Sequence, residues 1–159
     1  MKTTMDYSKA ADWIIGEKAF DSRLLGKGES IMCLGNGYFC IRSAAEERYV
    51  REKRDCFVAG TFNKFDENEV TELPNAADLM AMDLELNGQP FTLEQGEIKS
   101  YYRQLNLKTG ELTRTVDWLS PDGDEYRFVF ERIVSMKEKH VAAQRISVTP
   151  VTRDTDFLM

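Results

Sequence analysis

The 159-residue sequence has few of the side chains that build metal and redox centres. It contains one histidine, His140, and three cysteines, Cys33, Cys40 and Cys56. The spacing of Cys33 and Cys40 fits no zinc or redox motif. We therefore interpret the cysteines as small buried hydrophobic side chains and predict no metal and no cofactor.

The sequence also lacks the motifs that mark several common functions. It has no Gly-rich phosphate-binding loop, and neither Ser30 nor Ser135 lies in a Gly-x-Ser-x-Gly nucleophile motif. No apolar run approaches the ~18 residues of a membrane span, and the first residues carry no apolar signal-peptide core. Together with the odd number of cysteines, these absences predict a cytoplasmic protein with no membrane partner.

Positive charge is in deficit, since 21 Lys and Arg residues face 27 Asp and Glu residues and the formal net charge is -6. Nucleic-acid-binding domains generally carry a basic surface, so we predict no nucleic-acid partner. Hydrophobic residues make up 42% and charged residues 30% of the chain, which is typical of a globular domain. No Pro- or Ser-rich linker divides it, so residues 1–159 are expected to form one domain or part of one.

The sequence does contain a series of short β-strand patterns. In several segments apolar and polar residues alternate with a period of two, which predicts strands with one buried face. In one of these, Leu112, Arg114, Val116 and Trp118 share a face, so Trp118 is interpreted as a core residue. The predicted strands are 31–34, 38–41, 56–62, 80–86, 91–93, 101–107, 112–118, 126–131 and 141–148.

Turn sequences separate these predicted strands. Gly35-Asn36-Gly37 and Asn87-Gly88 consist of residues that tolerate positive φ, as hairpin turns require. Residues 108–111 and 120–123 are further turns. Helix evidence is confined to 44–54, which fits a short helix or a loop equally well. The predicted fold class is all-β, an antiparallel β-sandwich with little helix.

Two acidic clusters are candidates for chemistry. Glu46-Glu47 offers carboxylates, but sequence neighbours generally point apart, whereas glycosidase chemistry needs two carboxyl groups that flank one bond. Asp122-Gly123-Asp124-Glu125 resembles part of a calcium loop, yet the twelve-residue frame of such a loop is missing. We therefore interpret both clusters as solvated surface features.

Aromatic residues are abundant, with nine Phe, six Tyr and two Trp. Exposed rings stack on sugars, although most aromatic residues at alternating strand positions form the core. Trp13 precedes the first predicted hairpin, and its position in core or surface stays open. The residues alone indicate a β-domain without an evident active site. A carbohydrate-binding or interaction module and a small enzyme of unknown type remain alternatives.

A series of motifs extends through nearly the whole chain. They are Trp13, Phe20-Asp21, Glu29-Ser30-Ile31, Leu34-Gly35-Asn36-Gly37-Tyr38, Ile41-Arg42, Glu46-Glu47, 58–62, 72–75, 105–114, Glu131-Arg132, Ser135-Met136, 140–145 and Thr149-Pro150. With these motifs, in this order, the chain resembles the N-terminal β-sandwich domain of glycoside hydrolase family 65. That family contains the maltose, trehalose and kojibiose phosphorylases.

The resemblance implies a supersandwich-like domain, incomplete here, from an enzyme that transfers a glucosyl unit from an α-linked disaccharide to phosphate. A general-acid Glu and the phosphate-binding residues of such an enzyme lie in a following (α/α)6 barrel. No acid in this chain matches that Glu, so we predict no catalytic, cofactor-binding or metal residue here. Phe20-Asp21, Gly35-Asn36-Gly37-Tyr38 and Thr109-Gly110 are carried over as structural motif residues only.

The expected function is therefore that of a non-catalytic N-terminal domain with a scaffold or subunit-contact role, in a phosphorylase or hydrolase. A sandwich that ends early leaves a sheet edge and an apolar face uncovered, and such surfaces pair with another chain. We accordingly expect a homodimer, because two-fold dimers are the commonest closed assembly.

Overall fold

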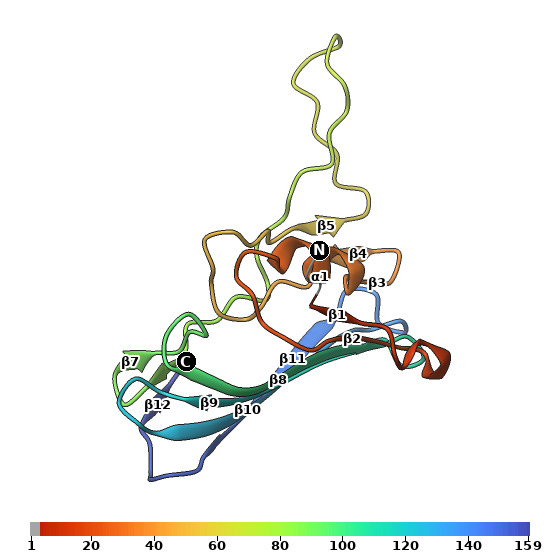
Figure 1. Cartoon of the computed structure of the whole chain (residues 1–159). Helices are drawn as coiled ribbons and strands as arrows, with labels where there is room; N and C mark the ends of the chain where they lie inside the picture. The colour runs from red at the N-terminus through yellow and green to blue at the C-terminus, as the bar shows by residue number, and fades with distance from the viewer. Residues whose placement is uncertain (1–3) are drawn as a thin grey trace.

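The computed structural model describes residues 4–159. Its largest sheet has six antiparallel strands (Figure 1). The strands lie in the order β1-β2-β8-β9-β10-β11, so the N-terminal strands add to one edge of a meander formed by the last four. These strands are β1 (Met5–Asp6), β2 (Ile14–Glu17), β8 (Glu97–Asn106), β9 (Glu111–Leu119), β10 (Glu125–Val134) and β11 (Ala142–Pro150).

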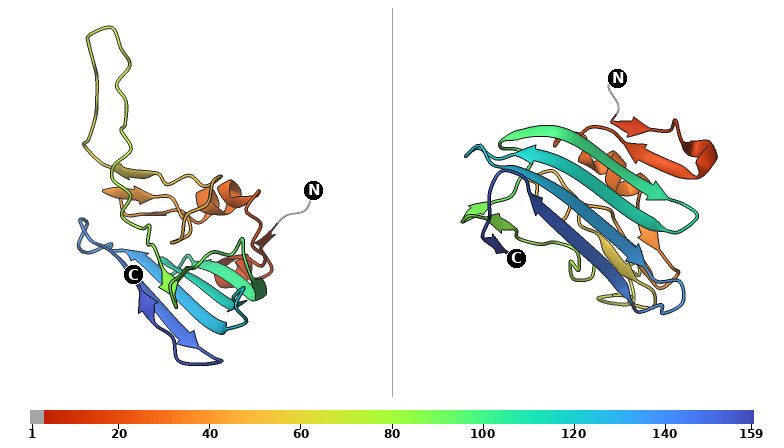
Figure 2. Two further views of the ribbon diagram at one scale, coloured as in Figure 1. Left: turned by 90° about the vertical axis from the view of Figure 1, so that its left-hand side faces the viewer. Right: turned by 90° about the horizontal axis from the view of Figure 1, so that it is seen from below.

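A second layer covers one face of this sheet, as Figure 2 shows. It contains the helix α1 (Leu25–Ile31) and a three-stranded sheet of β3 (Leu34–Gly35), β4 (Phe39–Ile41) and β5 (Cys56–Val58). A third small sheet joins β6 (Glu85–Leu86), β7 (Gln89–Pro90) and β12 (Phe157–Leu158), and η1 (Ala10–Asp12) is a short 3-10 helix. The two layers confirm an all-β sandwich with little helix.

The meander forms where alternation predicted it. Burial alternates through β9, and Trp118 lies opposite Tyr126 of β10, with both side chains inside the core. Phe91 packs against Trp118 and Phe128, with ring centroids 5.2 and 4.2 Å away. Trp118 is thus a core residue, as predicted. Truncating one such ring to alanine typically costs about 3–5 kcal/mol.

Several predicted strands are shorter than expected or absent. In 80–86 only Glu85 and Leu86 pair as a strand, although Met80 and Leu84 are buried. The apolar and polar residues alternate there because the segment buries some of its side chains. Most of its backbone is not paired with another strand. The strand predicted at 56–62 ends at Val58. The partner of β6 is β7, and not 91–93, whose apolar residues enter the core instead.

The N-terminal third differs most from the prediction. Residues 25–31 form α1, so the strand expected from Ile31 is wrong there, and β1 and β2 were not predicted. Residues 44–54 form a loop, which was one of the two alternatives. Within residues 4–159 no helix has the length and apolar character needed to cross a membrane.

The interpretation of all three cysteines as buried is also wrong. Cys56 is buried, but Cys33 and Cys40 are exposed. In β4 the side chains alternate between faces, and because Ile41 points into the core, Cys40 points outward.

Candidate functional site: a buried cluster of charged residues

The segment Ser43–Glu47 is an irregular loop that lies almost entirely inside the molecule. A buried loop must find partners for its backbone carbonyl groups, because no water reaches them. Arginine side chains from the large sheet supply these partners. Arg103 Nη1 donates to the carbonyl of Ser43 at 2.8 Å, and Arg132 Nη2 donates to the carbonyl of Ala44 at 3.1 Å.

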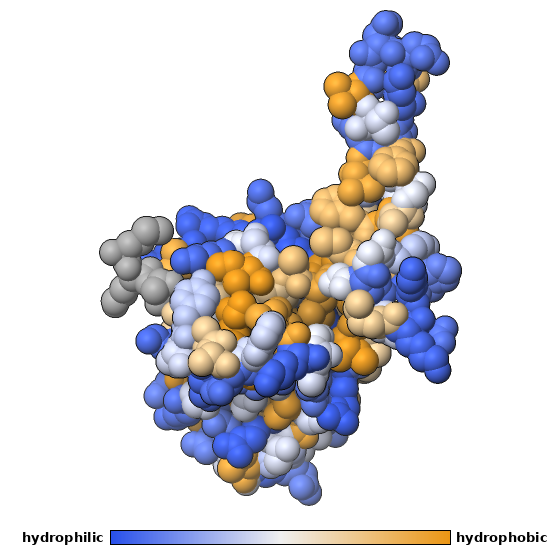
Figure 3. All heavy atoms as spheres, turned by 90° about the vertical axis from the view of Figure 1, so that its right-hand side faces the viewer, coloured by the Kyte–Doolittle hydropathy of each residue, from blue (hydrophilic) through white to orange (hydrophobic). Residues whose placement is uncertain are grey.

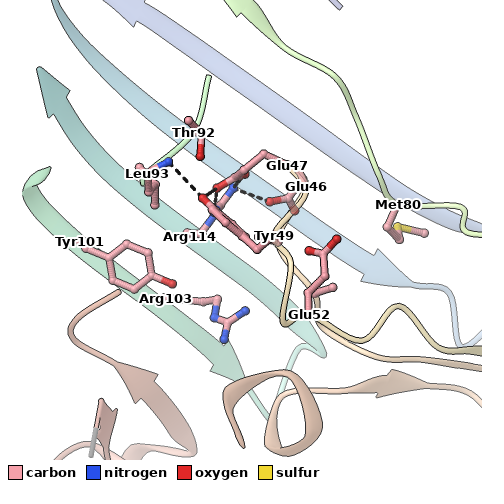
Figure 4. Close-up of polar contacts among 12 residues, drawn as sticks. Glu46, Glu47, Tyr49, Glu52, Met80, Thr92, Leu93, Tyr101, Arg103 and Arg114 are labelled. Carbon is pink, nitrogen blue, oxygen red and sulfur yellow. Dashed lines mark hydrogen bonds and ion pairs between the residues drawn. The ribbon is translucent and has the colours of Figure 1, made fainter. Parts of the chain in front are cut away.

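The two glutamates of this loop bind arginines of the same sheet (Figure 4). Arg114 of β9 donates to Glu47 Oε1 at 2.6 Å and to Glu46 Oε2 at 2.8 Å. Arg132 of β10 donates to Glu46 Oε1 at 2.7 Å. The Tyr49 hydroxyl donates to Glu47 Oε1 at 2.6 Å. Both carboxylates therefore hold charge-assisted hydrogen bonds, which are the stronger kind.

A third acid lies beside this pair and makes the number of acids equal to the number of arginines. Glu17 of β2 binds Arg103 Nη2 at 2.9 Å and accepts hydrogen bonds from the hydroxyls of Thr4 and Tyr101, each at 3.0 Å. The cluster thus contains three glutamates and three arginines. Paired charges are the condition under which ionised groups are found buried.

The electrostatics of the cluster keep the Glu47 carboxylate ionised. Burial by itself would raise the pKa of Glu47, but the charge and hydrogen bonds of Arg114 outweigh it, so the pKa of Glu47 is lowered. Burial likewise acts to lower the pKa of Arg114, and Glu47 and Glu46 raise it well above its ordinary value. A general acid must hold a proton near neutral pH and reach its substrate. Glu47 meets neither condition.

The space beside the cluster is too small for a substrate. The cavity between loop and sheet, lined by Ala44, Glu46, Arg103 and Arg114 among others, has a volume of about 10 Å³. That is room for about one water molecule. A disaccharide does not fit into this space, and the ion pairs beside it join the loop to the sheet.

The interpretation of Glu46-Glu47 as a solvated pair is therefore wrong, because both side chains are buried. A signal for their partners was present in the sequence, since Arg114 falls on the inward face of its predicted strand. An arginine at such a position requires an acid from another layer. The local sequence pattern does not show which acid pairs with Arg114.

The acidic turn after β9 is only partly solvated, contrary to the prediction. Asp122 and Glu125 are exposed, whereas Asp124 is buried and binds Arg153 Nη2 at 2.6 Å. Among residues 4–159, no three His, Cys, Asp or Glu side chains are grouped so as to hold a metal ion. Trp13 lies on the surface with 55% exposure.

The motif residues hold turns and layers together, as expected of structural residues. Asn36 Oδ1 accepts hydrogen bonds from the backbone of Tyr38 and Phe39, while its Nδ2 donates to the carbonyls of Ser135 and Lys139. The turn from β3 to β4 is thereby tied to the turn from β10 to β11.

The other motif residues also have structural roles. Phe20 packs on Tyr49, with ring centroids 4.9 Å apart, and Asp21 pairs with Arg23. Gly37 and Gly110 have positive φ, as their turns require. Gly35 does not have positive φ, so that part of the turn prediction is wrong.

The outer face of the large sheet carries a wider depression. Its volume is about 400 Å³, and its lining includes Asp117, Arg127 and Thr149. Arg127 Nε binds Asp117 Oδ1 at 2.6 Å, so these charges already satisfy one another. The aromatic residues of the lining, Trp118 and Tyr126, are buried in the core and offer no free ring to a sugar.

Together the fold and the cluster define an all-β domain in which buried pairs of acidic and basic side chains fasten a loop to a sheet. Residues 15–158 match the family described as glycosyl hydrolase family 65, N-terminal domain. The chain therefore belongs to this family, and the resemblance seen in its motifs is confirmed.

Relatives support the same assignment. Kojibiose phosphorylase of Halothermothrix orenii is 48% identical over 140 residues, covering 88% of this chain and 18% of that protein. Kojibiose phosphorylase of Escherichia coli is 32% identical, covering 91% and 19%, and α,α-trehalose phosphorylase of Thermoanaerobacter brockii is 34% identical, covering 88% and 20%. The chain thus spans about a fifth of the length of these relatives.

A solved structure shows the same fold. The chain described as "Putative kojibiose phosphorylase from human microbiome" superimposes with a TM-score of 0.82 over 94% of this chain and 21% of that chain. The two sequences are 19% identical, so this likeness concerns the fold alone.

Proposed function

We propose that this domain is a non-catalytic scaffold of an inverting α-glucosyl disaccharide phosphorylase. The proposal rests on the pairing and burial of the carboxylates. Glu17, Glu46 and Glu47 are each bound by an arginine and closed off from solvent. In an inverting phosphorylase one enzymic carboxyl protonates the leaving oxygen while phosphate attacks the opposite face of the sugar. That carboxyl would lie outside the matched region of the relatives.

The wider setting follows from the same proposal. Maltose, trehalose or kojibiose with phosphate would be the substrates of the whole enzyme, which would work in the cytoplasm as a homodimer. The formal charge of -6 supports the absence of nucleic-acid and anionic-membrane partners. The free thiols of Cys33, Cys40 and Cys56 support a reducing compartment.

Direct assays test whether the chain has chemistry of its own. Incubated with kojibiose, trehalose or maltose and phosphate, the chain is expected to release no glucose 1-phosphate, while the Halothermothrix orenii enzyme with kojibiose serves as positive control. Calorimetric titration with the same sugars tests the alternative of a carbohydrate-binding module, for which the outer depression is the candidate. Turnover that disappears in a Glu47→Gln variant would contradict the proposal.

A chimera tests the scaffold role itself. Replacing the matched residues of the Halothermothrix orenii enzyme with this chain is expected to keep phosphorolysis of kojibiose and the host's choice of disaccharide. The same chimera carrying Glu47→Gln should unfold at lower temperature, whereas the substrate preference of its folded fraction should not change. A soluble, folded chimera without activity, or one with altered sugar preference, would refute the scaffold role.

A further inference from the structure

A long hairpin-like projection, residues 61–74, stands away from the two layers, and we call it the arm (Figure 1). Every residue from Ala59 to Asn75 is exposed. The arm nevertheless carries large apolar side chains, with Phe62 67%, Phe65 87% and Val70 83% exposed. Figure 3 shows apolar side chains along the arm and polar ones around its tip. Large apolar patches on soluble proteins commonly mark interaction sites.

The arm is built as a defined structure. Asn63 and Glu72 pair across it through two backbone hydrogen bonds of 2.9 and 2.8 Å. At its base, Asn75 Oδ1 accepts from the backbone N–H of Cys56 at 2.7 Å, and Asn75 Nδ2 donates to the carbonyl of Arg54 at 3.1 Å. A preformed arm loses less conformational entropy on binding than a disordered one.

The charge of the arm indicates the kind of surface it fits. Between residues 61 and 74 one lysine faces four acids, Asp66, Glu67, Glu69 and Glu72. The complementary surface should therefore combine apolar and basic groups.

Such a surface exists on this chain, in the segment 48–53, which we call the basic loop. It contains Arg48, Arg51 and Lys53, and between them Val50 is 98% exposed. Its one acid, Glu52, is already bound by Arg54 at 2.6 Å. Within residues 4–159 no ion pair engages the side chains of Arg51 and Lys53.

We propose that the arm docks on the basic loop of a second copy of this chain, in a reciprocal two-fold dimer. Phe62, Phe65 and Val70 would contact Val50 of the partner's basic loop. The acids of the arm would face the basic side chains of that loop. Each leg of the arm is about seven residues long, a reach of roughly 23 Å if extended. The inference rests on the proposed homodimer and names its contact surfaces.

Sedimentation velocity of the full 159-residue chain at rising concentration tests the apolar contact. The wild type is expected to dimerise, and Phe62→Ser/Phe65→Ser should raise the dissociation constant at least tenfold. A matched control, Leu107→Ser/Val151→Ser, removes two exposed apolar side chains elsewhere, 48% and 61% exposed in the native chain. This control should dimerise like the wild type, and far-UV circular dichroism should show all three chains folded.

Charge reversal tests the partner surface. Arg51→Glu/Lys53→Glu alone and Glu67→Lys/Glu69→Lys alone should each weaken the dimer, and the quadruple variant should restore much of the loss. Restoration requires that the two segments face each other across the interface. Added salt should weaken the wild-type dimer, because the contact is between exposed charges.

The possible results distinguish failure of the proposed homodimer from failure of the arm contact. A wild type that stays monomeric up to about 1 mM, where even weak binding near -4 kcal/mol would be detected, overturns both the homodimer and the arm contact. A dimer unaffected by the arm substitutions overturns the arm contact and leaves the homodimer standing. A dimer that needs the arm but ignores charge reversal overturns the basic loop as its docking site.

Discussion

Three arginines of the large sheet, Arg103, Arg114 and Arg132, occupy inward positions that apolar residues fill elsewhere in the same strands. Each is almost fully buried, and the guanidinium of Arg114 also lies over the ring of Phe130 at 4.0 Å. Replacing a buried ion pair by apolar residues is often tolerated, but removing one partner leaves a charge without compensation. The stability of this cluster therefore depends on keeping both signs of charge.

Glu47→Gln should destabilise the fold strongly, because Arg114 would lose its closest partner while staying buried. The expected loss is about 3–5 kcal/mol in the free energy of unfolding at pH 7, measured by urea denaturation. The lowered pKa of Glu47 means that the unfolded state binds its proton first as pH falls. The contribution of Glu47 is thus present above its unfolded pKa and is lost as pH falls below about 4.5. A loss under 1 kcal/mol would contradict this view of the cluster.

Glu29 of α1 provides a control, because its pKa is shifted in the opposite direction to that of Glu47. It is as deeply buried as Glu47, but burial raises its pKa, and its pairing with Arg42 at 3.3 Å only partly opposes that effect. The folded state therefore keeps this proton longer than the unfolded state, and stability falls as pH rises through the raised pKa. Glu29→Gln should cost less than about 1 kcal/mol at pH 7 and should remove that part of the pH dependence.

At the scale of elements, the turn between β3 and β4 acts as a clamp between the two layers. Asn36 supports its own turn and also reaches the turn from β10 to β11, about a hundred residues away in sequence. Tyr38 adds a ring contact to His140 in that region, with centroids 4.2 Å apart. The Gly-Asn-Gly-Tyr motif therefore joins the two sheets, which a hairpin turn alone would not do.

Asn36→Ala should accordingly cost more than the loss of an ordinary turn residue. It removes four hydrogen bonds, each worth about 1 kcal/mol net, so we expect a loss of about 2–4 kcal/mol. Asn106→Ala is the matched control, because the Asn106 side chain accepts only from the backbone of its own turn. Thermal denaturation of both variants tests the difference, and equal costs would mean that the link to the second turn contributes nothing.

The elements that could be predicted from sequence are those whose signal is local. The alternation of β9 and the Asn87-Gly88 turn each follow from a few neighbouring residues, and both Asn87 and Gly88 have positive φ as that turn requires. The failures depend on distant partners. The sequence of α1 contains two glycines and gave no helix signal, while its Glu29 is fixed by Arg42. The buried glutamates needed arginines more than sixty residues away, which no local pattern reveals.

At the scale of the whole molecule, local stability should differ sharply between the sheet and the arm. β9 and β10 are paired on both sides and bury alternate side chains, whereas the arm holds one isolated bridge and no buried residue. Opening of the central strands therefore requires near-global unfolding, but the arm can open alone.

Hydrogen exchange followed by mass spectrometry checks this contrast. At concentrations where the chain is monomeric, arm amides should exchange within seconds to minutes, and those of β9 and β10 should be the slowest. At higher concentrations, arm protection should rise with the dimer fraction while the central strands stay unchanged. Slow exchange in the arm of a monomer would contradict the expectation that the arm opens independently of the large sheet.

The fastening of the buried loop by distant arginines also has a consequence for synthesis on the ribosome. Arg132 follows its partner Glu46 by 86 residues, and Arg103 follows Ser43 by 60. At typical elongation rates of about 5–20 residues per second, Glu46 is added to the chain roughly 4–17 s before the arginine that binds it. During that interval the loop has no sheet to dock on, and its carbonyl groups are held by water. The N-terminal third of this domain must therefore wait for the later strands, and a translational pause before β10 would prolong its exposure to chaperones and proteases.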